Sequence, residues 1–298
     1  MNILLTSEVS EAIQNNMPVV ALESTVIAHG LPFPQNLETA HKLEKIIRDI
    51  GAIPATIAVF AGDCFVGLDD EQIEKLATDK NIRKISPRDL AIAAAKLLDC
   101  ATTVATTAFF AHRAGIKVFA TGGIGGVHRG FAADVSADLP TLASTPITVV
   151  CSGAKIVLDL PVTRDWLETY GVTVLGWQCD EMPAFYTQTS GLPIDERVES
   201  AHDVAAIVNE RDQLNLQTAV LVTVPVPSEA EIERNELEII LDSALAAAGK
   251  QIITGKEITP FLLSQMSSLS SGRTLAANIA LLENNARVAA EIALVLHS

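Results

Sequence analysis

The chain has 298 residues, 49% of them hydrophobic, and its 21 basic and 36 acidic side chains give a formal net charge of −15. A chain of this length can bury a large core, either as one large α/β domain or as two smaller domains. The acidic excess argues against a nucleic-acid polymer or an anionic membrane as a partner, since both attract basic surfaces. It still allows a small phosphorylated ligand that is held by a few local donors.

Targeting signals and disulfides are not expected. The first apolar stretch is short for a signal peptide and is followed by Glu8 and Glu11, and no uninterrupted apolar run approaches the roughly 18 residues of a membrane span. The cysteines are far apart and show neither a CxxC nor a Cys/His zinc spacing, which predicts buried free thiols at Cys64, Cys100, Cys151 and Cys179. We therefore expect a soluble protein of a reducing compartment, the cytoplasm.

Apolar runs alternate with segments of helical periodicity. The expected strands cover residues 18–23, 56–60, 64–68, 117–120, 147–151, 172–177 and 219–224, the second and third as a hairpin. The expected helices cover residues 9–16, 36–50, 70–78, 87–98, 102–113, 154–160, 163–170, 203–214, 228–249, 259–269 and 274–296. This alternation predicts a layered α/β fold with a largely parallel central sheet, and we expect one domain over residues 1–298.

Ligands of such sheets bind beyond the carboxyl ends of the strands. The rule selects four stretches, residues 22–25, 121–126, 152–155 and 178–181. Two of them contain a chemically capable side chain, Glu23 and Lys155, and this edge of the sheet is therefore the predicted site.

Lys155 stands in the apolar run VVCSGAKIVLDL. A structural lysine whose ammonium reaches solvent is one interpretation, and a nucleophile that forms a Schiff base is the other. In the first turn of the helix expected from residue 154, the helix N-terminus would lower the pKa of Lys155 and favour the neutral amine. The small residues at 152–154 would let a substrate approach.

Glu23 closes an otherwise apolar strand. It is either a satisfied structural glutamate or a general acid whose pKa is raised by partial burial. His29, which follows in VIAHGLPFPQN, could be a loop histidine without chemistry. No Ser-His-Asp order and no GxSxG elbow offers a competing nucleophile.

The stretch TGGIGGVHRG, residues 121–130, is dense enough in glycine that its backbone must approach something closely. It is neither GxGxxG nor a Walker loop, and as an isolated motif it does not decide the function. With His128 and Arg129 beside it, contact with an anion or a sugar phosphate is one open interpretation.

Polar residues elsewhere allow two interpretations each. Asp134 and Asp138, with Ser136 between them, could hold Mg²⁺ or Mn²⁺ through one carboxylate and waters, or cap a helix. Lys84 and Arg88 could bind phosphate or be ordinary surface charges. Asn278, on the apolar face of the last expected helix, suggests a buried hydrogen bond.

Taken together, eight segments occur in a distinctive order over residues 18–290: VALESTVIAHGLPFPQN, RKISPRDL, FATGGIGGVHRG, DVSADL, CSGAKIVLDL, DEMPAFY, TPFLL and AANIALLENNA. The chain thereby resembles the pseudouridine-5'-phosphate glycosidases, also called indigoidine-synthase-A-like proteins. The resemblance implies a three-layer α/β/α sandwich, usually a homotrimer, with bound Mn²⁺. It also implies reversible cleavage of the C–C glycosidic bond of pseudouridine 5'-phosphate to uracil and ribose 5-phosphate.

The same resemblance implies residue roles. Glu23 would be the proton donor and Lys155 the covalent nucleophile, while Asp134 would be the metal site. The implied substrate contacts are Lys84, Val104 through its backbone, Ser136, Ala137, Asp138, His128 and Asn278. Three features depart from the family pattern: a shorter loop between Gly130 and Asp134, Met182 in place of an aromatic, and Pro87 where a basic residue is common.

A C-glycoside offers no leaving oxygen or nitrogen to protonate, so the two-carboxylate scheme of ordinary glycosidases does not transfer. We expect Glu23 to protonate the ring oxygen while Lys155 adds at C1', giving an open-chain iminium that promotes C–C cleavage and is then hydrolysed. Two rival functions stay open: a Schiff-base lyase or aldolase for another sugar phosphate, and a sugar-phosphate-binding protein without catalysis. The family's second name also suggests a role in a pigment pathway.

Overall fold

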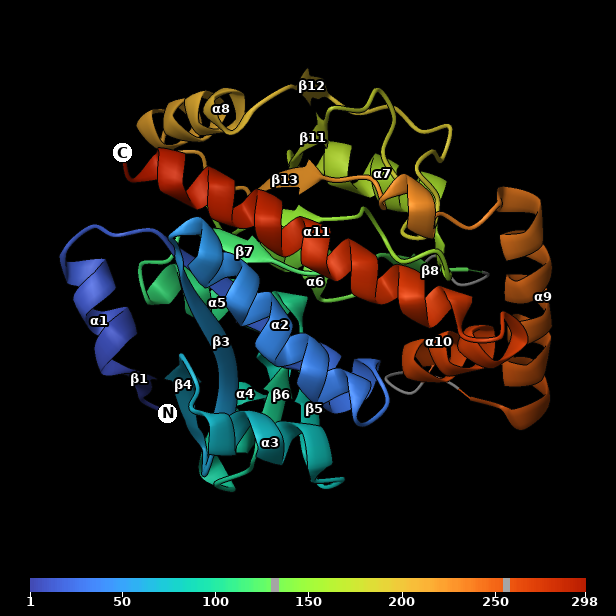
Figure 1. Ribbon diagram of the computed structural model, residues 1–298, viewed down its shortest axis with the longest axis horizontal. Helices are drawn as coiled ribbons and strands as arrows, with labels where there is room; N and C mark the ends of the chain where they lie inside the picture. Colours follow the sequence, from blue (N-terminus) through green and yellow to red (C-terminus); the bar gives the residue numbers. More distant parts are fainter. Residues whose placement is uncertain (130–133, 254–257) are drawn as a thin grey trace.

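The computed structural model describes residues 1–129, 134–253 and 258–298 and forms the predicted three-layer α/β/α sandwich (Figure 1). The main sheet runs in the order β1 (Ile3–Leu5), β4 (Asp63–Val66), β3 (Ile53–Phe60), β2 (Val19–Glu23), β7 (Val118–Ala120), β9 (Thr148–Cys151), β13 (Val220–Thr223), β11 (Thr173–Trp177) and β12 (Glu196–Val198). From β3 to β12 every neighbouring pair along this path is parallel.

Antiparallel pairing is confined to one end of the sheet. β3 pairs antiparallel with β4 and with β6 (Cys100–Thr102), and β6 also pairs in parallel with β5 (Arg83–Ile85). The central strands β2, β7, β9 and β13 are buried along their whole length. Burial on both faces is the reason that these strands appear in the sequence as continuous apolar runs.

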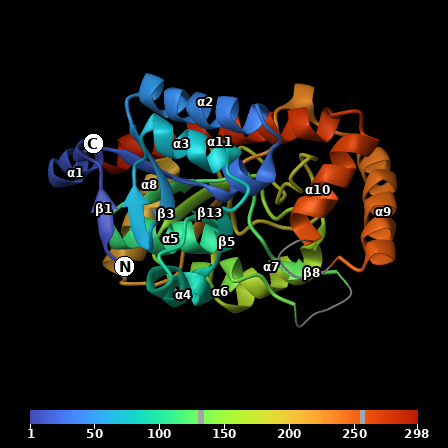
Figure 2. The ribbon, with the colours of Figure 1, turned by 90° about the horizontal axis from the view of Figure 1, so that it is seen from below.

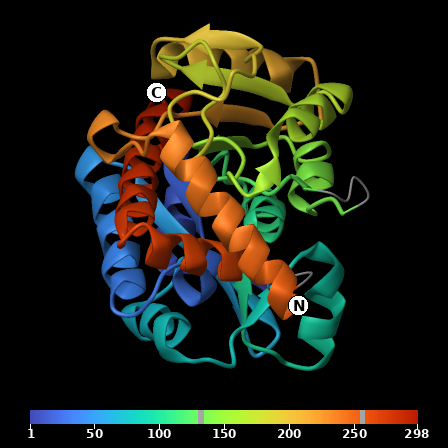
Figure 3. The ribbon, with the colours of Figure 1, turned by 90° about the vertical axis from the view of Figure 1, so that its right-hand side faces the viewer.

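Helices cover both faces of the sheet. Figure 2 shows α2 (Gln35–Ile50), α3 (Asp70–Thr78) and α11 (Arg273–Leu296) above it, and α4 (Leu90–Ala95), α5 (Val104–Arg113), α6 (Asp138–Leu142) and α7 (Leu160–Thr169) below it. The remaining long helices are α1 (Ser7–Gln14), α8 (Ala201–Gln213), α9 (Arg234–Gln251) and α10 (Ile258–Leu269). α9 and α10 pack together at one end of the molecule (Figure 3). Within the described ranges no helix is long and apolar enough to cross a membrane.

The predicted helix over residues 154–160 is wrong. These residues form a loop and the short strand β10 (Leu158–Asp159), which pairs with β8 (Val127–His128), and helix α7 begins only at Leu160. Gly153 has a φ of +80°, and Ala154 forms a bridge to Ile124. Lys155 therefore lies outside any helix, and its predicted position in the first turn of a helix is wrong.

Other boundaries differ less. Residues 87–89 form a 3₁₀ turn before a shorter α4, Thr102 ends β6 so that α5 starts at Val104, and residues 228–230 form a separate 3₁₀ turn before α9. The three-residue strands β1, β5, β6 and β12 were not predicted, because so short a segment carries little periodicity. The single-domain assignment stays a prediction. The four cysteines are free as predicted, three of them buried and Cys179 half-buried.

Candidate active site

A cavity of about 530 Å³ opens at the carboxyl ends of the central strands. It is lined by these residues assigned to the site from the sequence: Glu23, Lys84, Val104, His128, Asp134, Ser136, Ala137, Asp138 and Lys155. The exception is Asn278, which lines a smaller cavity of about 60 Å³ that shares Glu23, Lys84 and Lys155 with the first. The fold thus brings together residues that lie as far apart in the chain as Glu23 and Asn278.

Glu23 ends strand β2 and is only 9% exposed. The hydroxyl of Thr121, at the end of the neighbouring strand β7, donates a hydrogen bond to its Oε1. Burial raises the pKa of Glu23, because the charged carboxylate loses its hydration, and the positive charge of Lys155 and the Thr121 hydrogen bond offset this only in part. A carboxyl that keeps its proton above the ordinary pKa range of glutamate suits a general acid.

Lys155 is half-buried in the loop that follows β9. Its backbone N–H donates to the Ile124 carbonyl at 3.1 Å. The side chain of Arg129 donates to the carbonyls of Leu158 at 3.0 Å and Ile156 at 3.1 Å. These bonds hold the lysine-bearing segment, hereafter the Lys155 loop (residues 152–157), against the glycine-rich stretch.

A competing nucleophile next to the lysine is excluded by its chemistry. Cys151 ends strand β9 and is completely buried. Burial raises the pKa of its thiol to about 12, so the thiol stays protonated at neutral pH. Lys155 lines the cavity and Cys151 does not, so Lys155 is the accessible nucleophile at this strand end.

The glycines of residues 121–126 are explained by protein contacts. A Cβ at Gly125 would lie 2.3 Å from the Ser136 hydroxyl, and one at Gly126 would lie 2.3 Å from the Thr163 hydroxyl. The guanidinium of Arg129 binds carbonyls of the Lys155 loop and its following strand, and Arg129 lines a different cavity. The anion contact considered for the stretch therefore has no support from Arg129. Gly130 and the shortened loop up to residue 133 lie outside the described residues.

Asp138 is a buried cross-link as well as a cavity residue. Its Oδ1 accepts the N–H of Ala105 at 2.9 Å, and its Oδ2 accepts the N–H of Gly125 at 2.7 Å. The first turn of α5, which begins at Val104, is thereby tied to the glycine-rich stretch. The Ser136 hydroxyl accepts the N–H of Asp138 at 3.2 Å and so orders the segment that carries this carboxylate.

Asp134 has the properties of a solvent-accessible ligand for a hard cation. Its side chain is 54% exposed, and its Oδ2 lies 3.2 Å from Nδ1 of His128. Within the described residues no group of three or more His, Cys, Asp or Glu side chains could hold a metal ion. One carboxylate completed by waters and substrate oxygens fits Mg²⁺ or Mn²⁺, which keep several waters in such sites.

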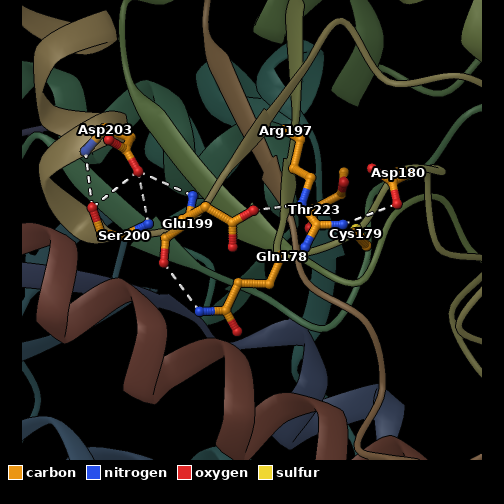
Figure 4. A network of polar contacts seen from close by, with 8 residues as sticks. All are labelled: Gln178, Cys179, Asp180, Arg197, Glu199, Ser200, Asp203 and Thr223. Carbon is orange, nitrogen blue, oxygen red and sulfur yellow. Dashed lines mark hydrogen bonds and ion pairs between the residues drawn. The ribbon is translucent and has the colours of Figure 1, made fainter.

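The fourth strand end selected from the sequence, residues 178–181, does not line the cavity. It lies at a separate hollow with Arg197 and Arg287. Figure 4 shows Arg197 between Asp180, at 2.9 Å, and Glu199, at 2.6 Å, while Gln178 donates to the Glu199 carbonyl. These groups bind one another around β12, and the expectation of a ligand contact at residues 178–181 is wrong for this cavity.

Residues 8–295 match the family model of indigoidine synthase A like proteins. The chain belongs to this family. Pseudouridine-5'-phosphate glycosidases of Caldanaerobacter subterraneus and Symbiobacterium thermophilum are 49% and 51% identical to it over 98% of the chain and 96% of their own lengths. The resemblance inferred from the sequence motifs is thereby confirmed.

Solved structures of two proteins have the same fold as this indigoidine synthase A like chain. Prealnumycin C-glycosynthase AlnA in complex with ribulose 5-phosphate matches with a TM-score of 0.91 and 38% identity. An indigoidine synthase A-like protein from Thermotoga maritima matches with a TM-score of 0.92 and 35% identity. Each match covers 100% of this chain and 97% of the other chain.

Three residues that organise the site were not assigned these roles from the sequence. Thr121 contacts Glu23, Arg129 holds the Lys155 loop, and Asn285 is a fully buried amide next to both strand ends. Thr121 and Arg129 belong to a stretch that drew notice for its glycines. Asn285 follows Asn284 in ENNA, and the sequence does not show which of the two asparagines is buried.

Proposed function

We propose that this protein cleaves the C–C glycosidic bond of pseudouridine 5'-phosphate reversibly to uracil and ribose 5-phosphate. The observation that carries the proposal is the shared cavity, which places the buried carboxyl of Glu23 and the side chain of Lys155 at one site. Relatives of about 50% identity are named for this activity, and a structural neighbour was solved with a five-carbon sugar phosphate.

Glu23 and Lys155 supply the two functions that the reaction needs. Glu23 gives its proton to the ribose ring oxygen as the bond from C1' to this oxygen breaks. The neutral amine of Lys155 bonds to C1' and loses a proton, which leaves an open-chain amine that still carries uracil. The iminium therefore forms at the next step, and not on ring opening as expected from the sequence.

Cleavage of the C–C bond follows from the nitrogen lone pair. The Glu23 carboxylate takes up the proton that Lys155 loses and passes it to C5 of uracil. The nitrogen lone pair then breaks the bond between C1' and C5, which releases uracil and leaves an iminium between C1' and Lys155. Water adds to the iminium and expels the lysine amine, which yields ribose 5-phosphate. One water is consumed. Hydrolysis of the iminium releases one proton, which returns to the Glu23 carboxylate, so that Glu23 and Lys155 regain their starting states.

The cavity has two positively charged side chains that suit a phosphorylated substrate. Lys84 on β5 and the exposed Arg88 line it, together with the imidazole of His128. Lys84 is assigned to the substrate, as are the first turn of α5 at Val104 and the segment 136–138. Asn278 would contact the substrate from the adjoining small cavity.

Mn²⁺ is the proposed cofactor, held by Asp134. The ion would supply positive charge that orients substrate oxygens. Asp134 is exposed at the cavity wall, where its Oδ2 lies beside Nδ1 of His128. A homotrimer in the cytoplasm is proposed on the family resemblance, with large apolar side chains such as Ile239 of α9 and Leu269 of α10 exposed at 70% and 50%.

Incubation of the protein with Mn²⁺ and pseudouridine 5'-phosphate tests the function. We expect free uracil and ribose 5-phosphate, detected by chromatography, and loss of essentially all turnover in Lys155→Ala. Borohydride added with ribose 5-phosphate should leave a reduced sugar adduct on Lys155, seen by peptide mass. An aldolase would instead cleave another sugar phosphate and release no uracil. A non-catalytic binding protein would bind the nucleotide unchanged, with no adduct.

A further inference from the structure

The buried amide of Asn285 bridges the two strand ends that serve the acid and the lysine. Asn285 lies on α11 and is 0% exposed. Its Nδ2 donates to the carbonyl of Thr121 at 2.9 Å and to the hydroxyl of Ser152 at 3.1 Å. The Ser152 hydroxyl donates back to Asn285 Oδ1 at 3.3 Å. The amide thus connects the end of β7 to the end of β9.

The end of β7 contacts Glu23, and the end of β9 continues into the loop that carries Lys155. Thr121 donates its hydroxyl to Glu23, and Ser152 is the first residue of the Lys155 loop. The two ends are also joined directly, because the Ser152 N–H donates to the Gly122 carbonyl at 2.9 Å. Asn285 itself lines neither the main cavity nor the small one.

The apolar surroundings of Asn285 make a polar side chain unfavourable at this position unless it forms hydrogen bonds. The neighbouring positions Leu281, Leu282, Val288 and Ala289 of α11 are buried and apolar. An amide in such a place loses its hydration, which its hydrogen bonds must offset. Those bonds, in the part of the chain that the structure describes, go to the ends of β7 and β9.

We propose that Asn285 is a positioning residue that fixes Glu23, through Thr121, and Lys155, through Ser152, at their working separation. The inference rests on the proposed function. Asn285 touches no substrate, so its effect must appear in the chemical step. Misplacement of reacting groups by about 1 Å lowers rates roughly 10²-fold.

The test uses Asn285→Leu, which keeps the approximate volume but removes the amide, and measures uracil release on folded protein well below its unfolding temperature. We expect kcat to fall roughly 10²-fold with KM little changed. Asn284→Ala is the matched control, because the Asn284 amide donates to the Pro225 carbonyl at 3.3 Å on the side of the separate hollow. Its kcat should equal that of the wild type.

A second readout separates positioning from plain stabilisation. Thr121→Val removes the hydrogen bond that lowers the pKa of Glu23, so the alkaline limb of the kcat profile should move to higher pH. Asn285→Leu should move it in the same direction, and the double variant should lose little more than either single one. The charges that act on Glu23, those of Lys155, Asp138 and Lys84, are unchanged in these variants.

Three outcomes decide the matter. If Asn285→Leu keeps the wild-type kcat and pH profile and only unfolds more easily, the positioning role is wrong. If it does not fold, Ser152→Ala removes one end of the bridge and must itself lower kcat with KM little changed, and a wild-type kcat there rejects the role. A wild type that releases no uracil removes the proposed function and this inference with it, whereas an active wild type with an equally active Asn285→Leu removes the inference alone.

Discussion

Glu23 shows how a single carboxyl acquires the properties of an acid catalyst. Its position at the end of a strand buried on both faces removes water, and this desolvation raises its pKa. Lys155 and the Thr121 hydroxyl stabilise the carboxylate, but burial has the larger effect. Because the proton is retained above the ordinary pKa of 4.5, the side chain can donate it under conditions in which an exposed glutamate is ionised.

Glu23→Gln should retain substrate binding and lower kcat by about 10²–10⁴-fold, the usual contribution of a general acid. The wild-type kcat should fall as the pH rises through the raised pKa of Glu23, since the protonated form is the active one. Glu23→Gln has no carboxyl at this position, so its residual kcat should not show this fall with rising pH. Initial-rate measurements of uracil release across pH check both points.

Glu44→Gln is the matched control for that substitution. Glu44 on α2 is also partly buried, its pKa is also raised by burial, and it also accepts a hydroxyl hydrogen bond, from Thr56 at 2.6 Å. It does not line either site cavity. A loss of turnover in Glu44→Gln as large as in Glu23→Gln would mean that the effect comes from removing a buried carboxyl group and not from acid catalysis.

At the scale of elements, the Lys155 loop and the glycine-rich stretch form one paired unit. Ile124 bridges to Ala154, β8 pairs with β10, and the Lys155 N–H donates to Ile124. Gly153 permits this arrangement. Its φ is +80°, and a Cβ there would lie 2.1 Å from the Pro183 carbonyl oxygen.

Gly153→Ala should therefore destabilise the protein by about 1–3 kcal/mol or more through backbone strain and should lower turnover, because the Lys155 loop must shift. Gly249→Ala is the control, since a Cβ at this position of α9 meets nothing within 4 Å. That variant should be more stable by about 0.5–1 kcal/mol, as expected for alanine in a helix. Chemical denaturation of both variants checks the signs, and an unaffected Gly153→Ala would contradict the packing argument.

Some elements could be predicted from the sequence, and the Lys155 loop could not. Buried strands such as β2 and β9 and long amphipathic helices such as α2 were predictable, because burial and periodicity leave local marks. The Lys155 loop was assigned to a helix because its pairing with residues 124–128 depends on contacts between distant segments. Asn285 was missed for a related reason, since a buried asparagine cannot be distinguished from its half-exposed neighbour Asn284 without the packing of α11.

At the scale of the molecule, the strand order explains why the site exists. β7 lies between β2 and β9, so Glu23 and the Lys155 loop emerge on either side of the end of one strand. Neighbouring strands are about 4.8 Å apart, and side chains of ordinary length can therefore meet across β7. Thr121 and Gly122, at the end of β7, become the natural link between acid and nucleophile. The strand order thus brings Glu23 and Lys155 together although they lie far apart in the sequence.

The exposure of Asp134 predicts how the stability of the protein should respond to removal of the metal. Structural metal sites close around several protein ligands and contribute folding free energy. Asp134 is half-exposed, and within the ranges that the structure describes no cluster of three candidate ligands surrounds it. A chelator should therefore leave the thermal unfolding temperature unchanged.

Metal binding, unlike the unfolding temperature, should depend on Asp134. Added Mn²⁺ should bind with an affinity that Asp134→Asn weakens, measured by isothermal titration on the metal-free protein. Asp99→Asn is the control, because the Asp99 carboxylate pairs with Lys75 away from the cavity. An unfolding temperature that falls by many degrees on chelation would show that the ion holds the fold together, through ligands beyond Asp134. Equal binding by wild type and Asp134→Asn would remove Asp134 as the ligand.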